Sequence, residues 1–105
     1  MNRNYNRGRA YEYKAKKALE QQGWTVIRAA GSHGPYDLIA FKEGQRVRCI
    51  QIKATKVAAG IRLLERRFSD QFEENAPEGA FERELWTWHK AKWHTFPQEG
   101  LDKPL

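Results

Sequence analysis

Apolar residues recur with helical spacing in two segments of the chain. The first segment covers residues 8–22 and places four of them on one face, at Tyr11, Ala15, Ala18 and Leu19. Gly23 follows, and glycine commonly ends a helix. The second segment covers residues 60–74 and carries a similar stripe, at Ile61, Leu64, Phe68 and Phe72. The pattern therefore predicts two helices, with the segment "NAPEG" ending the second.

The remaining apolar runs are short and typical of strands. Residues 24–30 predict one strand, followed by the loop "GSHGP". Residues 36–41 and 46–54 flank "KEGQ" and predict an antiparallel hairpin. The segment "ELWTWHKAKWHTF" predicts a second hairpin. The order helix, three strands, helix, two strands indicates an α/β domain with one mixed sheet, occupying the whole chain.

The strand at residues 46–54 carries both apolar and chemically useful side chains. Because side chains alternate along a strand, one face is expected to hold Val47, Cys49, Gln51 and Lys53. The other face then holds Arg48, Ile50 and Ile52. Apolar residues on both faces predict a central strand covered on both sides. The single cysteine, Cys49, excludes an internal disulfide and is expected to be a buried, inert thiol.

Positive charge is concentrated in the first part of the 105-residue chain. Residues 1–60 contain twelve lysines and arginines against four acidic residues, whereas residues 61–105 contain seven against nine. Such asymmetry favours a polyanionic partner, most simply nucleic acid, although a merely basic surface explains it equally well. Residues 1–9 are expected to form a flexible basic arm, and residues 97–105 a loose tail.

No apolar run reaches the roughly 20 residues of a membrane helix, and the N-terminus lacks the apolar core of a signal peptide. We therefore expect a cytoplasmic protein, of a prokaryote or of a virus or phage acting in a host cell, with no membrane partner.

Asp37 and Lys53 are residue types that metal-dependent phosphodiester cleavage uses. Carboxylates bind Mg²⁺ or Mn²⁺, and the metal lowers the pKa of a bound water. A nearby lysine can orient that water and stabilise the developing oxyanion. Alone, the pattern Asp…Gln-x-Lys is weak, because a turn aspartate and a solvated lysine occur in many hairpins.

The surrounding sequence is more specific. Residues 5–56, "YNRGRAYEYKAKKALEQQGWTVIRAAGSHGPYDLIAFKEGQRVRCIQIKATK", resemble the archaeal-type Holliday junction resolvases, a branch of the PD-(D/E)XK nuclease superfamily. The likeness includes an Arg-Gly segment, a glutamate in the first helix, the segment "RAAGS", an Asp-Leu strand start and the ending "IQIKATK". It implies a small restriction-endonuclease-like α/β fold, in which one central mixed β-sheet is flanked by helices.

The resemblance also implies an activity and a site. Family members are homodimers that bind four-way DNA junctions and nick two opposing strands. The implied cofactor is Mg²⁺, for which Mn²⁺ could substitute. No small-molecule cofactor is expected. The implied catalytic residues are Glu12, Asp37, Gln51 and Lys53. The implied metal ligands are Glu12, Asp37, Gln51 and the backbone carbonyl of Ile52. Candidate DNA-binding residues are Arg3, Arg7, Arg9, Arg28, Ser32, His33 and Lys56.

Gln51 departs from the family pattern, which has glutamate at this position. Glutamine keeps the shape and one carbonyl acceptor but loses the negative charge, so it is expected to weaken the metal site while preserving fold and DNA binding. Either the glutamine is native, with slow or altered activity, or it replaces a glutamate so that DNA is held uncut. Two rival functions stay open: a junction-binding protein that does not cut, and a repair- or restriction-type nuclease acting on duplex DNA.

The aromatic and histidine residues of the last hairpin have less distinctive patterns. Strand tryptophans more often pack in cores or interfaces than stack on unpaired bases, and we expect packing of Trp86, Trp88 and Trp93. His89 and His94 have no metal-ligand spacing and are assigned no site.

Overall fold

A computed structural model gives the fold and describes residues 3–29, 36–74 and 81–97. The elements, in chain order, are α1 (Arg3–Gln21), β1 (Thr25–Arg28), β2 (Leu38–Phe41), β3 (Val47–Ala54), α2 (Ala58–Glu74), β4 (Phe81–His89) and β5 (Lys92–Phe96). This order confirms the predicted helix, three strands, helix and two strands.

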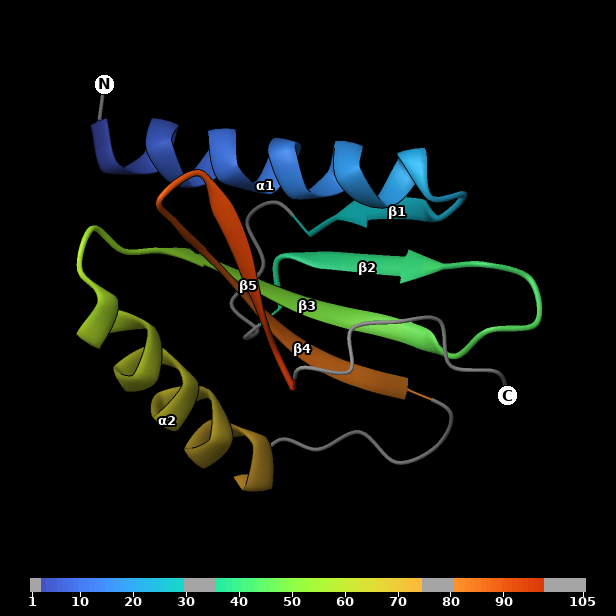
Figure 1. Cartoon of the computed structure of the whole chain (residues 1–105). Helices are drawn as coiled ribbons and strands as arrows, with labels where there is room; N and C mark the ends of the chain where they lie inside the picture. Colours follow the sequence, from blue (N-terminus) through green and yellow to red (C-terminus); the bar gives the residue numbers. More distant parts are fainter. Residues whose placement is uncertain (1–2, 30–35, 75–80, 98–105) are drawn as a thin grey trace.

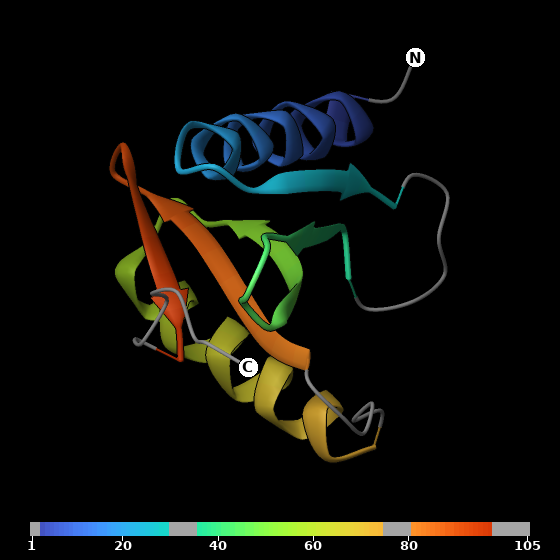
Figure 2. The same ribbon diagram turned by 90° about the vertical axis from the view of Figure 1, so that its right-hand side faces the viewer.

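The five strands form one mixed sheet in the order β1-β2-β3-β4-β5. Neighbouring strands are antiparallel except for β3 and β4, which are parallel because α2 connects them as a crossover. Helices α1 and α2 lie on opposite faces of the sheet (Figures 1 and 2). The predicted α/β class with a central mixed sheet is confirmed.

The main core lies between α1 and the sheet. Its buried members are Ala15, Leu19, Trp24, Val26, Leu38, Ala40, Ile50, Ile52 and Trp86. Ile50 and Ile52 share the α1 face of β3, as the alternation predicted. On the other side of the sheet, the buried Phe68 of α2 meets Phe96 edge to face, with ring centroids 6.2 Å apart. The central strand β3 is thus covered on both faces over its buried part.

Cys49 is buried, as expected for a structural thiol. Burial raises its pKa above the ordinary value, and the neighbouring Glu84 carboxylate adds to the effect. A thiol held in its neutral form reacts poorly as a nucleophile, because the thiolate is the reactive species.

The prediction of a flexible arm over residues 1–9 is wrong for residues 3–9. Helix α1 begins at Arg3, five residues before the predicted start at Gly8. Extending an existing helix avoids the cost of nucleation, and an internal glycine costs only about 1 kcal/mol relative to alanine. Residues 98–105 of the predicted tail and the loop at 31–35 lie outside the described residues.

Strand β4 begins at Phe81, three residues before the predicted hairpin, and charged pairs with β3 explain the difference. Arg48 donates from Nε and Nη2 to the two carboxylate oxygens of Glu84, each at 2.6 Å, and both side chains are buried. Two residues earlier on each side of the pair, Arg46 Nη1 donates to Glu82 Oε1 at 3.3 Å. These pairs help to fix the parallel register that aligns β3 with β4.

Aromatic rings complete the surroundings of the Arg48 charge. Its guanidinium carbon lies 4.8 Å from the Trp24 ring centroid and 5.7 Å from that of Trp86. Trp86 Nε1 also donates to Glu84 Oε1 at 3.0 Å. The buried carboxylate therefore accepts hydrogen bonds from two different side chains.

Replacing Glu84 by glutamine is expected to destabilise the fold by about 3–5 kcal/mol, because it leaves the buried Arg48 charge without its partner. Urea unfolding of the variant and the parent chain measures the difference. Glu82→Gln is the matched control, since its pair with Arg46 is partly exposed and is worth about 1 kcal/mol or less. Equal losses in the two variants would contradict the special role of the buried pair.

Candidate active site

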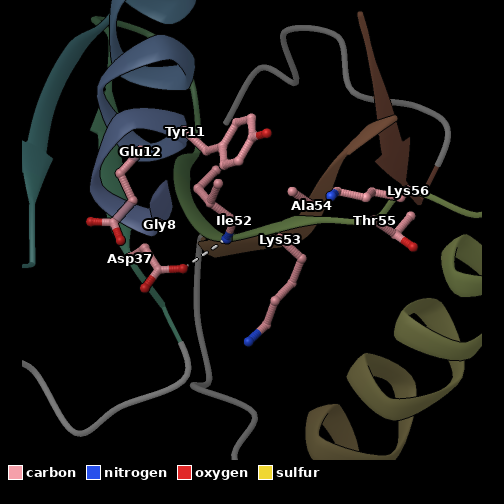
Figure 3. Close-up of a pocket in the computed structure, with 9 residues that line it drawn as sticks. All are labelled: Gly8, Tyr11, Glu12, Asp37, Ile52, Lys53, Ala54, Thr55 and Lys56. Atoms are coloured by element: carbon pink, nitrogen blue, oxygen red, sulfur yellow. Dashed lines mark hydrogen bonds between the residues drawn. The ribbon is translucent and has the colours of Figure 1, made fainter. Parts of the chain in front are cut away.

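A cavity of about 410 Å³ lies where the N-terminal half of α1 passes the start of β2 and the end of β3. The described residues that line it are Gly8, Tyr11, Glu12, Asp37, Ile52, Lys53, Ala54, Thr55 and Lys56 (Figure 3). The cavity collects residues from three elements that lie far apart in the sequence. Glu12, Asp37 and Lys53, each predicted as a catalytic residue, all contribute to its wall.

Asp37 directly precedes β2 and is fixed against β3. Its N–H donates to the Ile50 carbonyl at 2.8 Å, and its Oδ2 accepts from the Ile52 N–H at 2.8 Å (Figure 3). Burial raises the pKa of Asp37, against the lowering effects of the Ile52 hydrogen bond and the Lys53 and Arg28 charges. A cation bound at this carboxylate would stabilise its charged form.

Glu12 extends from α1 toward Asp37 (Figure 3) and forms an ion pair. Arg28 Nε, at the end of β1, donates to Glu12 Oε1 at 2.9 Å, and only 14% of the Arg28 side chain and 20% of the Glu12 side chain are exposed. The Arg28 guanidinium also lies 5.1 Å from the ring centroid of Tyr13. Arg28 was predicted to contact DNA, but in this structure it pairs with Glu12, a predicted metal ligand. Contact between Arg28 and DNA stays a prediction.

Two lysines supply positive charge to the cavity. Lys53 is exposed on β3, and its charge acts on Asp37, as the lowering effect on the Asp37 pKa indicates. Lys56 follows the end of β3 and is also exposed. Cationic side chains beside paired carboxylates suit a site that receives a phosphate group.

Gln51 lies on β3 opposite Leu85 and is half-buried, two residues before Lys53. Strand alternation gives the two residues the same face of the sheet. Gln51 is not among the described residues that line the cavity, whereas the neighbouring Ile52 is. The roles of the Gln51 amide and the Ile52 carbonyl as metal ligands stay predictions.

The donor set fits a hard divalent cation. Two carboxylates, Glu12 and Asp37, line one cavity together with Ile52 of β3. Mg²⁺ is commonly bound through one or two carboxylates and retains several waters. Within residues 3–29, 36–74 and 81–97, no group of three histidine, cysteine or acidic residues is placed to hold a metal. Glu12 and Asp37 would therefore be the carboxylates that hold a divalent cation in this cavity.

Of the remaining predicted DNA-binding residues, only Arg9 has a described side chain, and Arg9 is not among the residues that line the cavity. Arg9 lies on α1, where its Nη2 is 3.5 Å from the Tyr13 hydroxyl and its guanidinium carbon 5.5 Å from the ring centroid. Arg3 and Arg7 belong to the first turns of α1, and only their backbone is described. Ser32 and His33 lie outside the described residues. Their contacts with DNA stay predictions.

Sequence reasoning assigned no site role to four residues that line the cavity, Gly8, Tyr11, Ala54 and Thr55. Tyr11 belongs to the apolar stripe of α1 and packs against the core, as predicted, but it also reaches the cavity wall. Thr55 follows β3, and its hydroxyl accepts a hydrogen bond from the Val57 N–H at 3.3 Å. The only available signals were that Tyr11 directly precedes Glu12 and that Thr55 belongs to the motif ending "IKATK".

The tryptophans of the last hairpin are packed, as expected. Trp86 is buried in the core, and Trp93 packs against it with ring centroids 5.6 Å apart. Trp88 is half-buried beside Trp93. His89 Nδ1 lies 3.0 Å from the Thr55 carbonyl, a contact that anchors the hairpin to the end of β3.

Three comparisons relate the chain to known proteins. Residues 3–72 match the family described as archaeal Holliday junction resolvase (hjc). Over 45 residues the chain is 44% identical to the crossover junction endodeoxyribonuclease Hjc of Methanocaldococcus jannaschii. The aligned segment covers 43% of this chain and 33% of that relative's length. The solved structure of Archaeoglobus fulgidus Hjc, a Holliday junction resolvase from an archaeal hyperthermophile, matches with a TM-score of 0.57 at 23% identity, over 94% of this chain and 79% of that chain. This last likeness shows a shared fold.

Among the helices in the described part of the chain, none has the length and apolar character to cross a membrane.

Proposed function

The chain belongs to the archaeal Holliday junction resolvase family, and on this premise we propose that it is a metal-dependent endonuclease that binds four-way DNA junctions and nicks opposing strands. The observation that carries the proposal is the meeting of Glu12, Asp37 and Lys53 in one cavity. Two carboxylates and a lysine are the side chains that this hydrolysis needs, and they come from three separate elements.

The residues have separate roles in the proposed reaction. Glu12 and Asp37 would hold Mg²⁺, which when bound supplies a water of lowered pKa and neutralises charge on the phosphate. Lys53 orients the attacking water and donates hydrogen bonds to the oxyanion that develops on the phosphate. Lys56 binds a neighbouring phosphate of the same strand. The Ile52 N–H keeps the Asp37 carboxylate in a fixed orientation.

Gln51 makes the proposed enzyme slow or inactive toward cleavage. An amide oxygen can still bind a cation, but it brings no negative charge, so the metal is held less tightly than with glutamate. This feature favours a second candidate function, a protein that binds junction DNA without cutting it. A nicking assay on a junction whose branch point cannot migrate, with Mg²⁺ or Mn²⁺, separates the two candidates.

We further propose that the functional unit is a homodimer. A four-way junction has approximate two-fold symmetry, and a dimer with isologous contacts presents two identical sites related by such an axis. Phosphate neutralisation by the basic surface of each subunit supplies most of the affinity, which therefore falls steeply with salt. Preference for the junction comes from geometry, because only a branched molecule contacts both subunits fully.

At fixed salt, the protein is expected to bind a four-way junction about ten- to a hundredfold more tightly than a linear duplex of equal length, because both subunits are engaged together. Sedimentation with and without the junction, in the presence of a matched duplex competitor, measures assembly and preference. A monomer that binds both DNAs equally would contradict the proposal. Equal binding by a dimer that cuts duplex would instead support a repair- or restriction-type nuclease.

A further inference from the structure

A second hollow lies on α1, separate from the proposed active site. It is an open groove of about 550 Å³ between α1 and the β4–β5 hairpin, which rises toward the helix (Figure 1). Its described lining residues are Ala10, Tyr13, Lys14, Lys17, Ala18, Gln21, Trp88 and Trp93. Its size falls within the roughly 300–1,000 Å³ typical of small-ligand sites. None of these described lining residues is among those predicted to bind DNA or metal.

The floor of the groove is aromatic. Trp88 and Trp93 meet edge to face, with ring centroids 5.0 Å apart, and both are half-buried. Trp88 also lies 6.4 Å from Tyr11, centroid to centroid, and Tyr11 lines the cavity that holds Glu12 and Asp37. The aromatic floor therefore runs from the groove to the wall of the proposed active site.

The rim of the groove is positively charged. Lys14 Nζ lies 4.6 Å from the Trp88 ring centroid, which places a cation beside the indole. Lys17 is exposed one turn further along α1. At the hairpin turn, Lys90 and Lys92 are exposed as well. No acidic residue is among the described residues that line the groove.

We propose that this groove binds an unpaired nucleotide of DNA, with its base against the Trp88 indole and its phosphates on Lys14 and Lys17. The inference rests on the proposed function, since it names where a strand near the active site would lie. Aromatic faces beside cations are the usual means of holding single-stranded DNA, because every base has a face that can stack. A base inside intact duplex is already stacked and paired, so duplex DNA cannot reach the indole in this way.

Charge argues against a second copy of the chain as the occupant. An isologous interface would bring Lys14 and Lys17 close to their own counterparts. With no acidic lining residue in the described part of the groove to offset them, these like charges would repel. A polyanion would instead be attracted by the same lysines.

The lysine contribution is tested with the double variant Lys14→Gln, Lys17→Gln and a dT20 oligonucleotide. Affinity is expected to fall on the order of tenfold, and the slope of log K against log salt to decrease by about 1.4, for two single-strand phosphate contacts. The matched control is Arg66→Gln, Arg67→Gln, which removes two exposed helix charges from α2, on the opposite face of the sheet. An equal loss in both double variants would overturn the inference, since net charge alone would then explain it.

The aromatic contribution is tested by fluorescence. Trp24 and Trp86 are only 3% and 6% exposed, so quenching by a bound base reports on the other two tryptophans. dT20 is expected to quench the parent protein, and Trp88→Phe is expected to remove most of this quenching while keeping the affinity, because phenylalanine still stacks. Trp88→Leu is expected to lower the affinity about five- to a hundredfold.

Three further outcomes, all with Trp88 variants, would overturn the inference. The first is quenching by dT20 that Trp88→Phe leaves unchanged. The second is a Trp88→Leu variant that is folded by circular dichroism and binds dT20 like the parent. The third is Trp88→Leu weakening self-association without DNA, which would assign the groove to a second copy of the chain. All three experiments use single-stranded DNA or the protein alone, and none measures junction binding or nicking. A protein without junction preference or nicking activity would therefore contradict the proposed function but not the proposed role of the groove.

Discussion

Replacing Gln51 by glutamate is expected to raise Mg²⁺-dependent nicking of a four-way junction by about 100- to 1,000-fold. The new carboxylate would complete the acid-x-Lys pattern with Lys53 and, in the proposed site, would add a charged ligand for the metal that Asp37 and Glu12 hold. A change of this size is typical for a single group that stabilises charge in the transition state. Junction affinity without metal is expected to stay nearly unchanged, because the substitution preserves shape. Initial nicking rates at saturating protein measure the effect.

Two controls make this result specific to the site. Gln22→Glu adds the same charge at an exposed position in the turn after α1 and is expected to leave the nicking rate unchanged. Lys53→Ala in the Gln51→Glu background is expected to abolish nicking while keeping most of the binding. A folded, DNA-binding Gln51→Glu protein that cuts no faster than the parent would show that residue 51 has no role in metal binding. Undiminished cutting without Lys53 would remove that residue from the mechanism.

Replacing Asp37 by asparagine is expected to abolish nicking and at the same time to stabilise the metal-free fold. Burial raises the pKa of Asp37 above its ordinary value, so the charged form is less favourable in the folded state than in the unfolded state. Asparagine removes that charge, and its side-chain oxygen can still accept from the Ile52 N–H. The gain is expected to be about 0.5–2 kcal/mol at pH 7, as for other active-site residues that trade stability for function.

The pH dependence of this gain has a definite sign. Between its unfolded and folded pKa values, Asp37 binds more protons in the folded protein, so the stability of the parent chain falls as pH rises through that window. The difference between Asp37→Asn and the parent is therefore expected to be full above the folded pKa, to shrink as pH falls through that window, and to be smallest below the unfolded pKa. Urea unfolding in EDTA at several pH values measures it. A gap that grows as pH falls, or a less stable variant at pH 7, would contradict burial as the dominant influence on this carboxyl.

The sequence by itself determined the order of the elements and the directions of side chains within them. Helical and strand periodicities are local properties, so the mixed α/β fold followed from apolar spacing. The period of two along β3 correctly separated the buried Ile50 and Ile52 from Cys49 on the opposite face. The same local pattern, extended by family resemblance, pointed to Asp37 and Lys53 together. The start of α1 was missed because the polar residues 3–9 show no apolar period, although they continue the helix.

Only the tertiary structure decided which side chains meet. Glu12 and Arg28 form an ion pair across 16 positions of the chain, so two residues that the sequence assigned to metal and to DNA are partners. Arg48 and Glu84 meet across 36 positions, and their pairing could not be read from either strand alone. Local spacing sets the direction of a side chain, whereas the packing of distant elements determines what it meets. For that reason the sequence could suggest which residues to propose as catalytic, but not their partners or the groove beside Trp88.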